Sequence, residues 1–438
     1  MHISAIASLA GLVGLAASAS LPTISTKGSK FFTSNGDQWF VKGVAYQLSD
    51  SDPLLDAAQC NMDASLMARL GANAIRVYHV TDGDHSGCME AFANNGIYLF
   101  VDLDTFNTQI DQTSPHFNQT QLSAFEAVMD EFQSYDNVAG FFIGNEVVTL
   151  PLYSEAMAFV KLSVQLVKEY RMNKGYRNIP IGYSHADVSS LRPLLQDYLA
   201  CGSNANATVD FFGLNTYEWC GDSSFSVSGY QTLTQQIMDY PVPIFMSEDG
   251  CNTVPPRTFQ DQLTIFGSEM APYWSGAIIY EWLQETNAYG LVTYGGNAQA
   301  VAPSDGPTAV TRSGTPTPIT PDFSNLMSAW SSATPSSVSQ AAYSPSLTNP
   351  PCPAYTTPSS STGWAINGDV ALPTLGQVLD ASASASITAG TAAASSGAAA
   401  SSSTKKGGAP LAHDTTRAGA QCAIIGLVAA LFGVVGWL

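Results

Sequence analysis

The chain has 438 residues, with 35 Asp and Glu against 16 Lys and Arg and a formal net charge of −19. This length allows one large domain with extensions. The acidic balance argues against nucleic acid or anionic lipid as a partner, because both select for basic patches. It suits an acidic extracellular setting or a neutral polymer as substrate.

The N-terminus has the composition of a secretory signal peptide. Residues 3–19 are apolar and small and end in Ala17-Ser18-Ala19, an A-x-A cleavage pattern. The segment before them carries His2 but no Lys or Arg. We predict a signal peptide over residues 1–19. A buried helix is the alternative, and the recurring Gly and Ser residues disfavour it.

From residue 20 to about residue 343 the sequence alternates short apolar runs with longer amphipathic stretches. The runs predict eight strands, at residues 39–45, 74–78, 97–103, 138–143, 179–183, 211–214, 244–247 and 277–280. Helices are expected between most of them, for example at residues 63–70, 121–134, 151–170 and 259–270. Eight β-then-α units in a row predict an α/β fold, a (β/α)8 TIM barrel. A doubly wound open sheet is the runner-up, but no Gly-rich phosphate loop follows the first strand.

The C-terminal region changes composition twice. Residues 301–351 are rich in Pro, Ser and Thr yet retain Phe323, Leu326, Met327 and Trp330, so we expect a strap lying on the barrel and closed by Cys352. The catalytic domain with this strap then spans residues 20–352, and residues 353–380 are a possible ordered extension. Residues 381–407 form a Ser/Ala-rich stalk that cannot bury a core and is expected to be disordered.

The last residues resemble a signal for a glycosylphosphatidylinositol (GPI) anchor. Three small residues, 407–409, precede a polar spacer and an uncharged apolar tail over residues 422–438. We predict Gly407 as the anchor residue, with Ser402 or Ser403 as alternatives, and residues 408–438 as a propeptide. The mature protein would meet the membrane through this lipid only, at the outer face of the plasma membrane and in the cell wall.

The cysteines and sequons fit secretion. Cys422 lies in the predicted propeptide, and an even set of six remains. Such a set predicts three disulfides, whose pairing the sequence alone does not fix. No CxxC or His/Cys cluster occurs, so a metal site is not expected. Asn118 and Asn206 begin N-glycosylation sequons and are predicted to lie on the surface.

Two predicted strands end in a carboxylate. Residues 138–143 run into Gly144, Asn145 and Glu146, and residues 244–247 run into Glu248. Strands four and seven lie on opposite sides of a closed barrel, so carboxylates at their ends can face each other across its mouth. Glu146 alone would more simply be a helix cap or an ion-pair partner. A pair about 5 Å apart is what retaining glycosidases use, one as acid/base and one as nucleophile.

Context assigns the roles within this pair. Glu146, beside Asn145, is predicted as the proton donor, with a pKa raised in part by repulsion from ionised Glu248, the predicted nucleophile. The sequence alone leaves the exchanged assignment open. Asn145 could hold the sugar 2-hydroxyl, a bond that strengthens in the transition state. Arg76 is expected to pair with a carboxylate inside the mouth.

Several aromatic residues follow the predicted strands. They are Tyr78, Tyr217, Trp219, Tyr280 and Trp282. Core packing would explain each one singly. Together they favour a glycan cleft, because sugars stack on aromatic rings, and Tyr217 could also hydrogen-bond the nucleophile.

Seven short motifs together resemble a known family. They are GVAYQ at 43–47, RVY at 76–78, GNEV at 144–147, GYS at 182–184, NTYEWCG at 215–221, SEDGC at 247–251 and YGLV at 289–292. In this order they resemble the fungal cell-wall β-1,3-glucanosyltransferases of glycoside hydrolase family 72. The resemblance runs from about residue 24 to residue 352, and it points to the branch without a cysteine-rich glucan-binding module.

The resemblance implies an activity and a set of site residues. The enzyme would cut a β-1,3-glucan internally and transfer the new reducing end to the non-reducing end of another glucan. Glu146 would be the proton donor and Glu248 the nucleophile, and the reaction would use no metal or cofactor. Tyr78, Asn145, Asp187, Arg192 and Tyr280 match glucan-contacting positions, and residues 105–113 would border the cleft. Without the resemblance, Asp187 and Arg192 would be interpreted as solvated helix-start charges.

The family also suggests the disulfides Cys60–Cys88, Cys201–Cys352 and Cys220–Cys251. His79 and residues 82–85 differ from the family pattern, which bears on acceptor preference more than on catalysis. Donor and acceptor glucan chains are the expected partners, and the protein is expected to be a monomer. An endo-β-1,3-glucanase and a non-catalytic glucan-binding wall protein are the alternatives.

Overall fold

The computed structural model describes residues 21–49, 51–296 and 299–379. The predicted signal peptide, the Ser/Ala stalk, Gly407 and the propeptide lie outside these residues. Over the part that is described, no helix is long and apolar enough to span a membrane.

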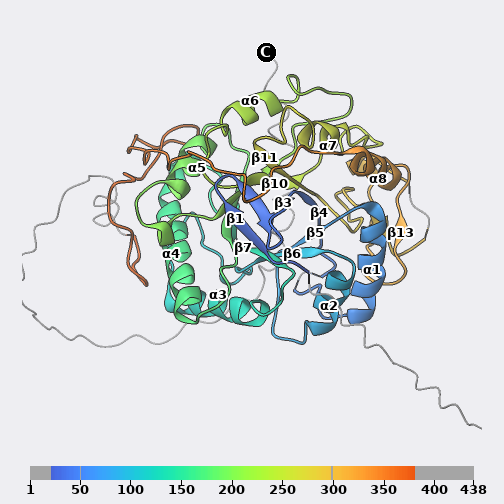
Figure 1. Ribbon diagram of the computed structural model, residues 1–438, viewed down its shortest axis with the longest axis horizontal. Helices are drawn as coiled ribbons and strands as arrows, with labels where there is room; N and C mark the ends of the chain where they lie inside the picture. Colours follow the sequence, from blue (N-terminus) through green and yellow to red (C-terminus); the bar gives the residue numbers. More distant parts are fainter. Residues whose placement is uncertain (1–20, 50, 297–298, 380–438) are drawn as a thin grey trace, which may run out of the picture.

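Eight parallel strands form a closed barrel, with helices around it (Figure 1). The strands are β4 (Val41–Ala45), β5 (Ala74–Val77), β6 (Tyr98–Asp102), β7 (Val138–Asn145), β8 (Ile181–Ala186), β9 (Phe211–Thr216), β10 (Ile244–Asp249) and β11 (Trp274–Ile279). Each pairs with its neighbours in chain order, and β11 pairs with β4, Gly276 opposite Val41. This closure confirms the predicted TIM barrel and rules out the open sheet.

Within the described residues, seven outer helices lie between consecutive barrel strands, where the sequence predicted helices between most of the strands. They are α1 (Ala57–Leu70), α2 (Ser86–Asn94), α3 (Gln119–Phe132), α4 (Met157–Asn173), α5 (Arg192–Ala200), α6 (Tyr230–Gln235) and α7 (Gln260–Ile265). The stretch predicted at residues 151–170 divides into the 3-10 helix η1 (Pro151–Ala156) and α4. The stretch predicted at 259–270 is shorter in the structure, where α7 begins one residue later, after Phe259 with its left-handed φ of 55°, and ends at Ile265.

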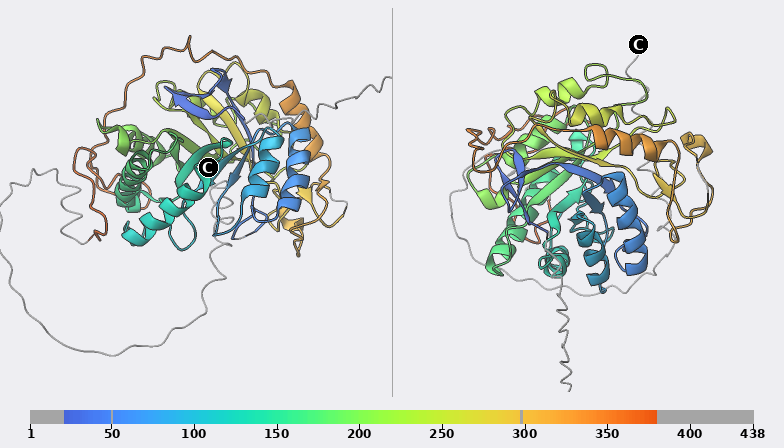
Figure 2. Two further views of the ribbon diagram at one scale, coloured as in Figure 1. Left: turned by 60° about the horizontal axis from the view of Figure 1, so that its bottom comes forward. Right: turned by 45° about the vertical axis from the view of Figure 1, so that its right-hand side comes forward.

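A small N-terminal sheet, not predicted as a unit, lies across one end of the barrel (Figure 2). It consists of β1 (Ile24–Lys27), β2 (Lys30–Thr33) and β3 (Gln38–Trp39). The buried ring of Phe31 packs 5.9 Å from the rings of Phe211 and Phe245 inside the barrel. Since Phe211 and Ile244 begin their strands, the sheet closes the amino-terminal end and leaves the carboxyl-terminal end as the mouth.

The strap is partly helical. After η3 (Pro303–Asp305) and the β12 (Val292–Thr293)–β13 (Thr317–Pro318) pair, α8 (Asp322–Ser332) packs beside α1 and α7. Phe323, Leu326 and Trp330 are buried, whereas Met327 is 40% exposed. The apolar residues predicted to hold a strap therefore form the inner face of a helix.

The chain continues along the barrel past the strap. Trp364 is fully buried, with its ring 5.4 Å from that of Tyr198. Further on, Val378 forms a β-bridge with His116 in the connection between β6 and α3. Residues 353–379 thus run from the disulfide at Cys352 to a loop of the catalytic face.

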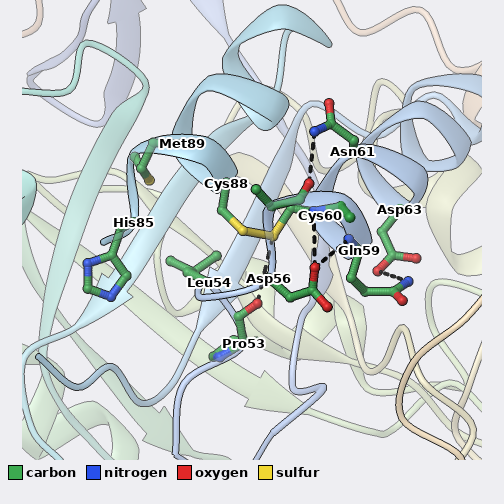
Figure 3. The surroundings of a disulfide bond; sticks show 12 residues. Pro53, Leu54, Asp56, Gln59, Cys60, Asn61, Asp63, His85, Cys88 and Met89 are labelled. Atoms are coloured by element: carbon green, nitrogen blue, oxygen red, sulfur yellow. Dashed lines mark hydrogen bonds between the residues drawn. A yellow bond between two sulfur atoms is a disulfide. The ribbon is translucent and has the colours of Figure 1, made fainter. Parts of the chain in front are cut away.

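The structure forms the three disulfides that the family resemblance implies. Cys60–Cys88 joins α1 to α2 (Figure 3), Cys201–Cys352 fixes the strap, and Cys220–Cys251 links the loops that follow β9 and β10. The last of these lies close to the predicted nucleophile in the chain. The 3-10 helix η2 (Ala205–Ala207) follows α5 near the strap bridge.

Candidate active site

Arg76 occupies the centre of the barrel mouth. Its fully buried guanidinium holds Asp102 by two bonds, 2.7 Å from Nη2 to Oδ2 and 3.0 Å from Nε to Oδ1. Nη2 also donates to Asn145 Oδ1 at 3.0 Å, and Nη1 lies 3.7 Å from Glu248 Oε1. The expectation that Arg76 pairs with a carboxylate is confirmed. A bidentate pair of this kind fixes the position and orientation of the guanidinium.

Glu248, in β10, is buried and held by both oxygens. Tyr78 donates to Oε1 at 3.0 Å and Tyr217 donates to Oε2 at 2.7 Å. Burial raises the pKa of Glu248 above its usual value, and the charge of Arg76 and the two tyrosine hydroxyls offset part of this rise. Three groups therefore stabilise the ionised carboxylate in an apolar setting, the condition that a nucleophile needs.

Glu146 follows β7 directly and has a left-handed φ of 49°. Such a conformation is uncommon outside glycine, and here the Glu146 N–H bonds Ser184 O at 2.9 Å. Asn215 Nδ2 donates to Glu146 Oε1 at 2.8 Å. Burial and the nearby charge of Glu248 raise the pKa of Glu146 to about 7. A carboxyl group with this pKa can both give and take a proton near neutrality.

Asn215 connects the two glutamates and was not predicted as a site residue. It is the register partner of Glu248 on the neighbouring strand, and its amide donates to both Glu146 and Asn145. Its own oxygen accepts from Ser184 and Ser247, at 2.9 and 2.8 Å. The available signal was its position: Asn215 stands near the end of β9 as Asn145 stands at the end of β7.

An aromatic wall lies beside Glu248. The rings of Tyr217, Tyr280 and Tyr289 are 5.4 to 6.3 Å apart, each pair edge to face. Gln47 donates to Tyr280 Oη at 3.2 Å. Tyr78, Tyr217 and Tyr280 thus gather on the predicted face. By contrast, Trp219 turns away, buried against Tyr230 at 5.4 Å, and Trp282 is part of the core.

Asp187 and Arg192 lie to one side of the glutamates. They form an ion pair with each other. Thr216 donates to Asp187 Oδ2 at 3.2 Å, and Arg192 donates to Gln236 at 2.5 Å. Thr216, which lies between Asn215 and Tyr217 in the chain, connects Asp187 to the end of β9. The structure therefore places them at the edge of the mouth.

The loop over residues 105–113 also reaches the mouth. Gln112 exchanges hydrogen bonds of 3.0 Å with Thr149, which lies three residues beyond Glu146. Phe106 is 50% exposed, and its ring lies 4.0 Å from that of His79 at the end of β5. The loop thus borders the mouth on the side of Glu146.

The remaining predicted sites lie on the periphery. Asn118 caps α3, where its Oδ1 accepts the N–H groups of Thr120 and Gln121, and Asn206 is in η2. Both side chains are half-buried. Among the residues described, no group of three or more His, Cys, Asp or Glu side chains could hold a metal ion.

A closed (β/α)8 barrel with two glutamates in different environments at its mouth is an arrangement that glycoside hydrolases and transglycosidases use. A family model described as Glucanosyltransferase matches residues 13–305. The chain belongs to this family, glycoside hydrolase family 72, and is a retaining transglycosylase.

Similar proteins agree with this assignment. A 1,3-beta-glucanosyltransferase, gas2 of Schizosaccharomyces pombe, is 39% identical over 370 residues, 81% of this chain and 76% of that protein. GAS5 of Saccharomyces cerevisiae is 42% identical over 299 residues, and the match covers 66% of this chain and 62% of that relative. A mutant of Saccharomyces cerevisiae Gas2p in complex with laminaritetraose and laminaripentaose is 33% identical, with a TM-score of 0.70 over 81% of this chain and 74% of that one.

Proposed function

We propose that this chain is a retaining β-1,3-glucanosyltransferase that cleaves a β-1,3-glucan internally and transfers the new reducing end to the non-reducing end of another glucan. Glu146 is the acid/base and Glu248 the nucleophile. The observation that carries these roles is the pair of contrasting environments. Glu248 accepts two tyrosine hydroxyls and lies beside Arg76, whereas Glu146 has one amide partner and a pKa of about 7.

The reaction takes two displacements. In the first displacement Glu248 attacks the anomeric carbon, and the bond between this carbon and the glycosidic oxygen breaks. Glu146 donates its proton to that oxygen. The reducing-end part leaves, and the rest stays as an ester on Glu248. In the second, the ionised Glu146 takes the proton of an acceptor hydroxyl, whose oxygen attacks the same carbon and frees Glu248.

The neighbouring side chains position the donor. Asn145 is held by Arg76 and Asn215 through its oxygen, which directs its amide nitrogen away from both and leaves it free to bind the sugar 2-hydroxyl. Tyr78, Tyr217 and Tyr280 contact the sugar at the cleavage point. Asp187 and Arg192 bind glucan further from it, and residues 105–113 border the cleft. The laminari-oligosaccharides in complex with Saccharomyces cerevisiae Gas2p in related structures support this class of ligand.

Hydrolysis is the competing outcome of the same intermediate. Water attacks in an endo-glucanase, whereas a sugar attacks where the acceptor binds well. Incubation of the protein with a reduced laminari-oligosaccharide separates the two: products longer than the donor support transfer, and only shorter products contradict it. A non-catalytic wall protein predicts no product, and it is disfavoured because both glutamates are present with their partners.

The proposed setting is extracellular. The protein is secreted, loses residues 1–19, and is anchored by GPI at Gly407 to the outer face of the plasma membrane and the cell wall. Residues 20–352 are the catalytic domain with its strap, and residues 381–407 the stalk. Three disulfides support an oxidising route. Asn118 and Asn206 carry N-glycans, and the enzyme is a monomer.

A further inference from the structure

A second groove lies outside the barrel mouth. Its volume is about 640 Å³, within the range of small-molecule sites. The wall from the β9 side contributes Trp219, Phe225 and three serines, and the wall from the β10 side contributes residues of α7 and Glu269. None of the residues assigned above to catalysis lines it.

The groove begins at the rim of the mouth. Helices of a (β/α)8 barrel start at the carboxyl ends of the strands, so Gln231 in the first turn of α6 and Gln260 in the first turn of α7 mark the rim end. Leu263, Thr264 and Glu269 follow along α7 and beyond it, down the outside of the barrel. Figure 1 shows α6 and α7 as neighbours on one side.

The wall from the β9 side is joined to the catalytic strands. Tyr217, which donates to Glu248, lies two residues before Trp219. The disulfide Cys220–Cys251 ties this wall to the loop that begins three residues after Glu248. The wall of the groove that carries Trp219 is therefore attached to the same two strand ends, those of β9 and β10, that carry Tyr217 and Glu248.

The chemistry of the lining selects a neutral, hydroxyl-rich ligand. Its polar members are hydroxyl and amide side chains with one carboxylate, Glu269, and no cation. A lining with a carboxylate and no cation disfavours an anionic ligand. Phe225 and Leu263 add apolar surface, and Leu263 is 46% exposed. Hydroxyls, amides and apolar faces together suit a sugar chain.

We propose that this groove binds a distal stretch of the same β-1,3-glucan whose other end lies in the barrel mouth. This inference rests on the proposed function and adds a second binding site to it. The site would retain long chains near the nucleophile and favour their use over short ones. Short oligosaccharides that fill only the mouth would not use it.

The test uses the full chain in a Glu248→Gln background, so that glucan is bound and not consumed. The triple variant Phe225→Ala/Gln231→Ala/Gln260→Ala removes lining groups, and Leu263→Arg instead places a bulky charge in the groove. Met238→Arg is the matched control, because Met238 is 47% exposed on a neighbouring segment and does not line the groove. Binding to insoluble linear β-1,3-glucan and to laminaripentaose is measured.

Both groove variants should bind the insoluble glucan at least about fivefold more weakly, while laminaripentaose binding and the control stay unchanged. Equal binding of the long glucan by groove variants and control overturns the proposal. An equal loss for the short ligand also overturns it, since the groove would then be part of the mouth. Failure of the proposed function would give a different result. The protein with Glu248 intact would then form no product longer than the donor oligosaccharide, whether or not the groove binds glucan.

Discussion

The hydrogen bond from Asn215 to Glu146 allows a direct test of the role of Glu146 as the acid/base. Asn215 Nδ2 donates to Glu146 Oε1 at 2.8 Å, and the bond favours the ionised carboxylate. Asn215→Ala removes this stabilisation, so the pKa of Glu146 must rise above its value of about 7. A hydrogen bond to a charged group contributes about 1.5–3 kcal/mol, and one pKa unit is about 1.4 kcal/mol. The expected rise is therefore about one to two units.

The assay is the pH dependence of kcat/KM for transfer between laminari-oligosaccharides. In the wild-type protein the first step needs protonated Glu146, so kcat/KM should fall as the pH rises through about 7. In Asn215→Ala the whole profile should be lower, because Asn145 also loses a partner. Its alkaline limb should nevertheless lie at higher pH.

Thr216→Val is the matched control for this experiment. It is the next residue of β9 and is buried, but its hydroxyl bonds Asp187 and not Glu146. Its alkaline limb should coincide with that of the wild-type protein. An unmoved limb in Asn215→Ala, or one that moves to lower pH, would refute the assignment of Glu146 as the titrating acid.

Three further predictions concern Glu146, Tyr217 and Trp364. The raised folded-state pKa of Glu146 means that its ionisation destabilises the fold, not at all below the unfolded pKa near 4.5 and fully above about 7. Glu146→Gln removes this ionisation and should raise the free energy of unfolding by about 1–3 kcal/mol at pH 8, with no increase at pH 4. An equal increase at both pH values would contradict this linkage. Tyr217→Phe removes the 2.7 Å hydrogen bond to Glu248 and should lower kcat about 10- to 100-fold. The control Tyr273→Phe, outside the site, should keep the wild-type kcat. Equal kcat values for the two variants would exclude a role of the Tyr217 hydroxyl in stabilising Glu248. Trp364→Ala should lower the free energy of unfolding by about 3–5 kcal/mol in chemical denaturation, because Trp364 is fully buried. Trp364→Phe should lower it much less, because the indole N–H has no hydrogen-bond partner among the described residues. Similar losses of stability in the two variants would contradict a packing role for the ring.

The sequence predicts the barrel because its strands are short apolar runs buried on both faces. Residues 138–143 and 244–247 are such runs, and the structure extends each by two residues through the polar ends that carry the chemistry. The predicted boundaries of helices were wrong where the backbone dihedral angles depart from helical values. Phe259 looks like a helix start in the sequence, but its left-handed conformation delays α7 by one residue.

Long-range partners could not be predicted in the same way. Glu146 and Glu248 were predicted together because both end apolar strands, a local signal. The position of Asn215 between them depends on the register of β9 against β10, which no local pattern fixes. Likewise, the sheet of β1–β3 depends on the insertion of Phe31 among rings from distant strands. Residues 353–379 are held by contacts such as that of Trp364 with Tyr198.

The central claim is that Glu248 forms the covalent bond to the sugar. A 2-fluoro laminari-oligosaccharyl fluoride slows the second displacement and should leave a glycosyl ester on the enzyme. Mass spectrometry of its peptides should then find the added mass on Glu248, and Glu248→Gln should remain unlabelled. A label on Glu146 or on another residue, or full turnover with no label at any time, would contradict the account.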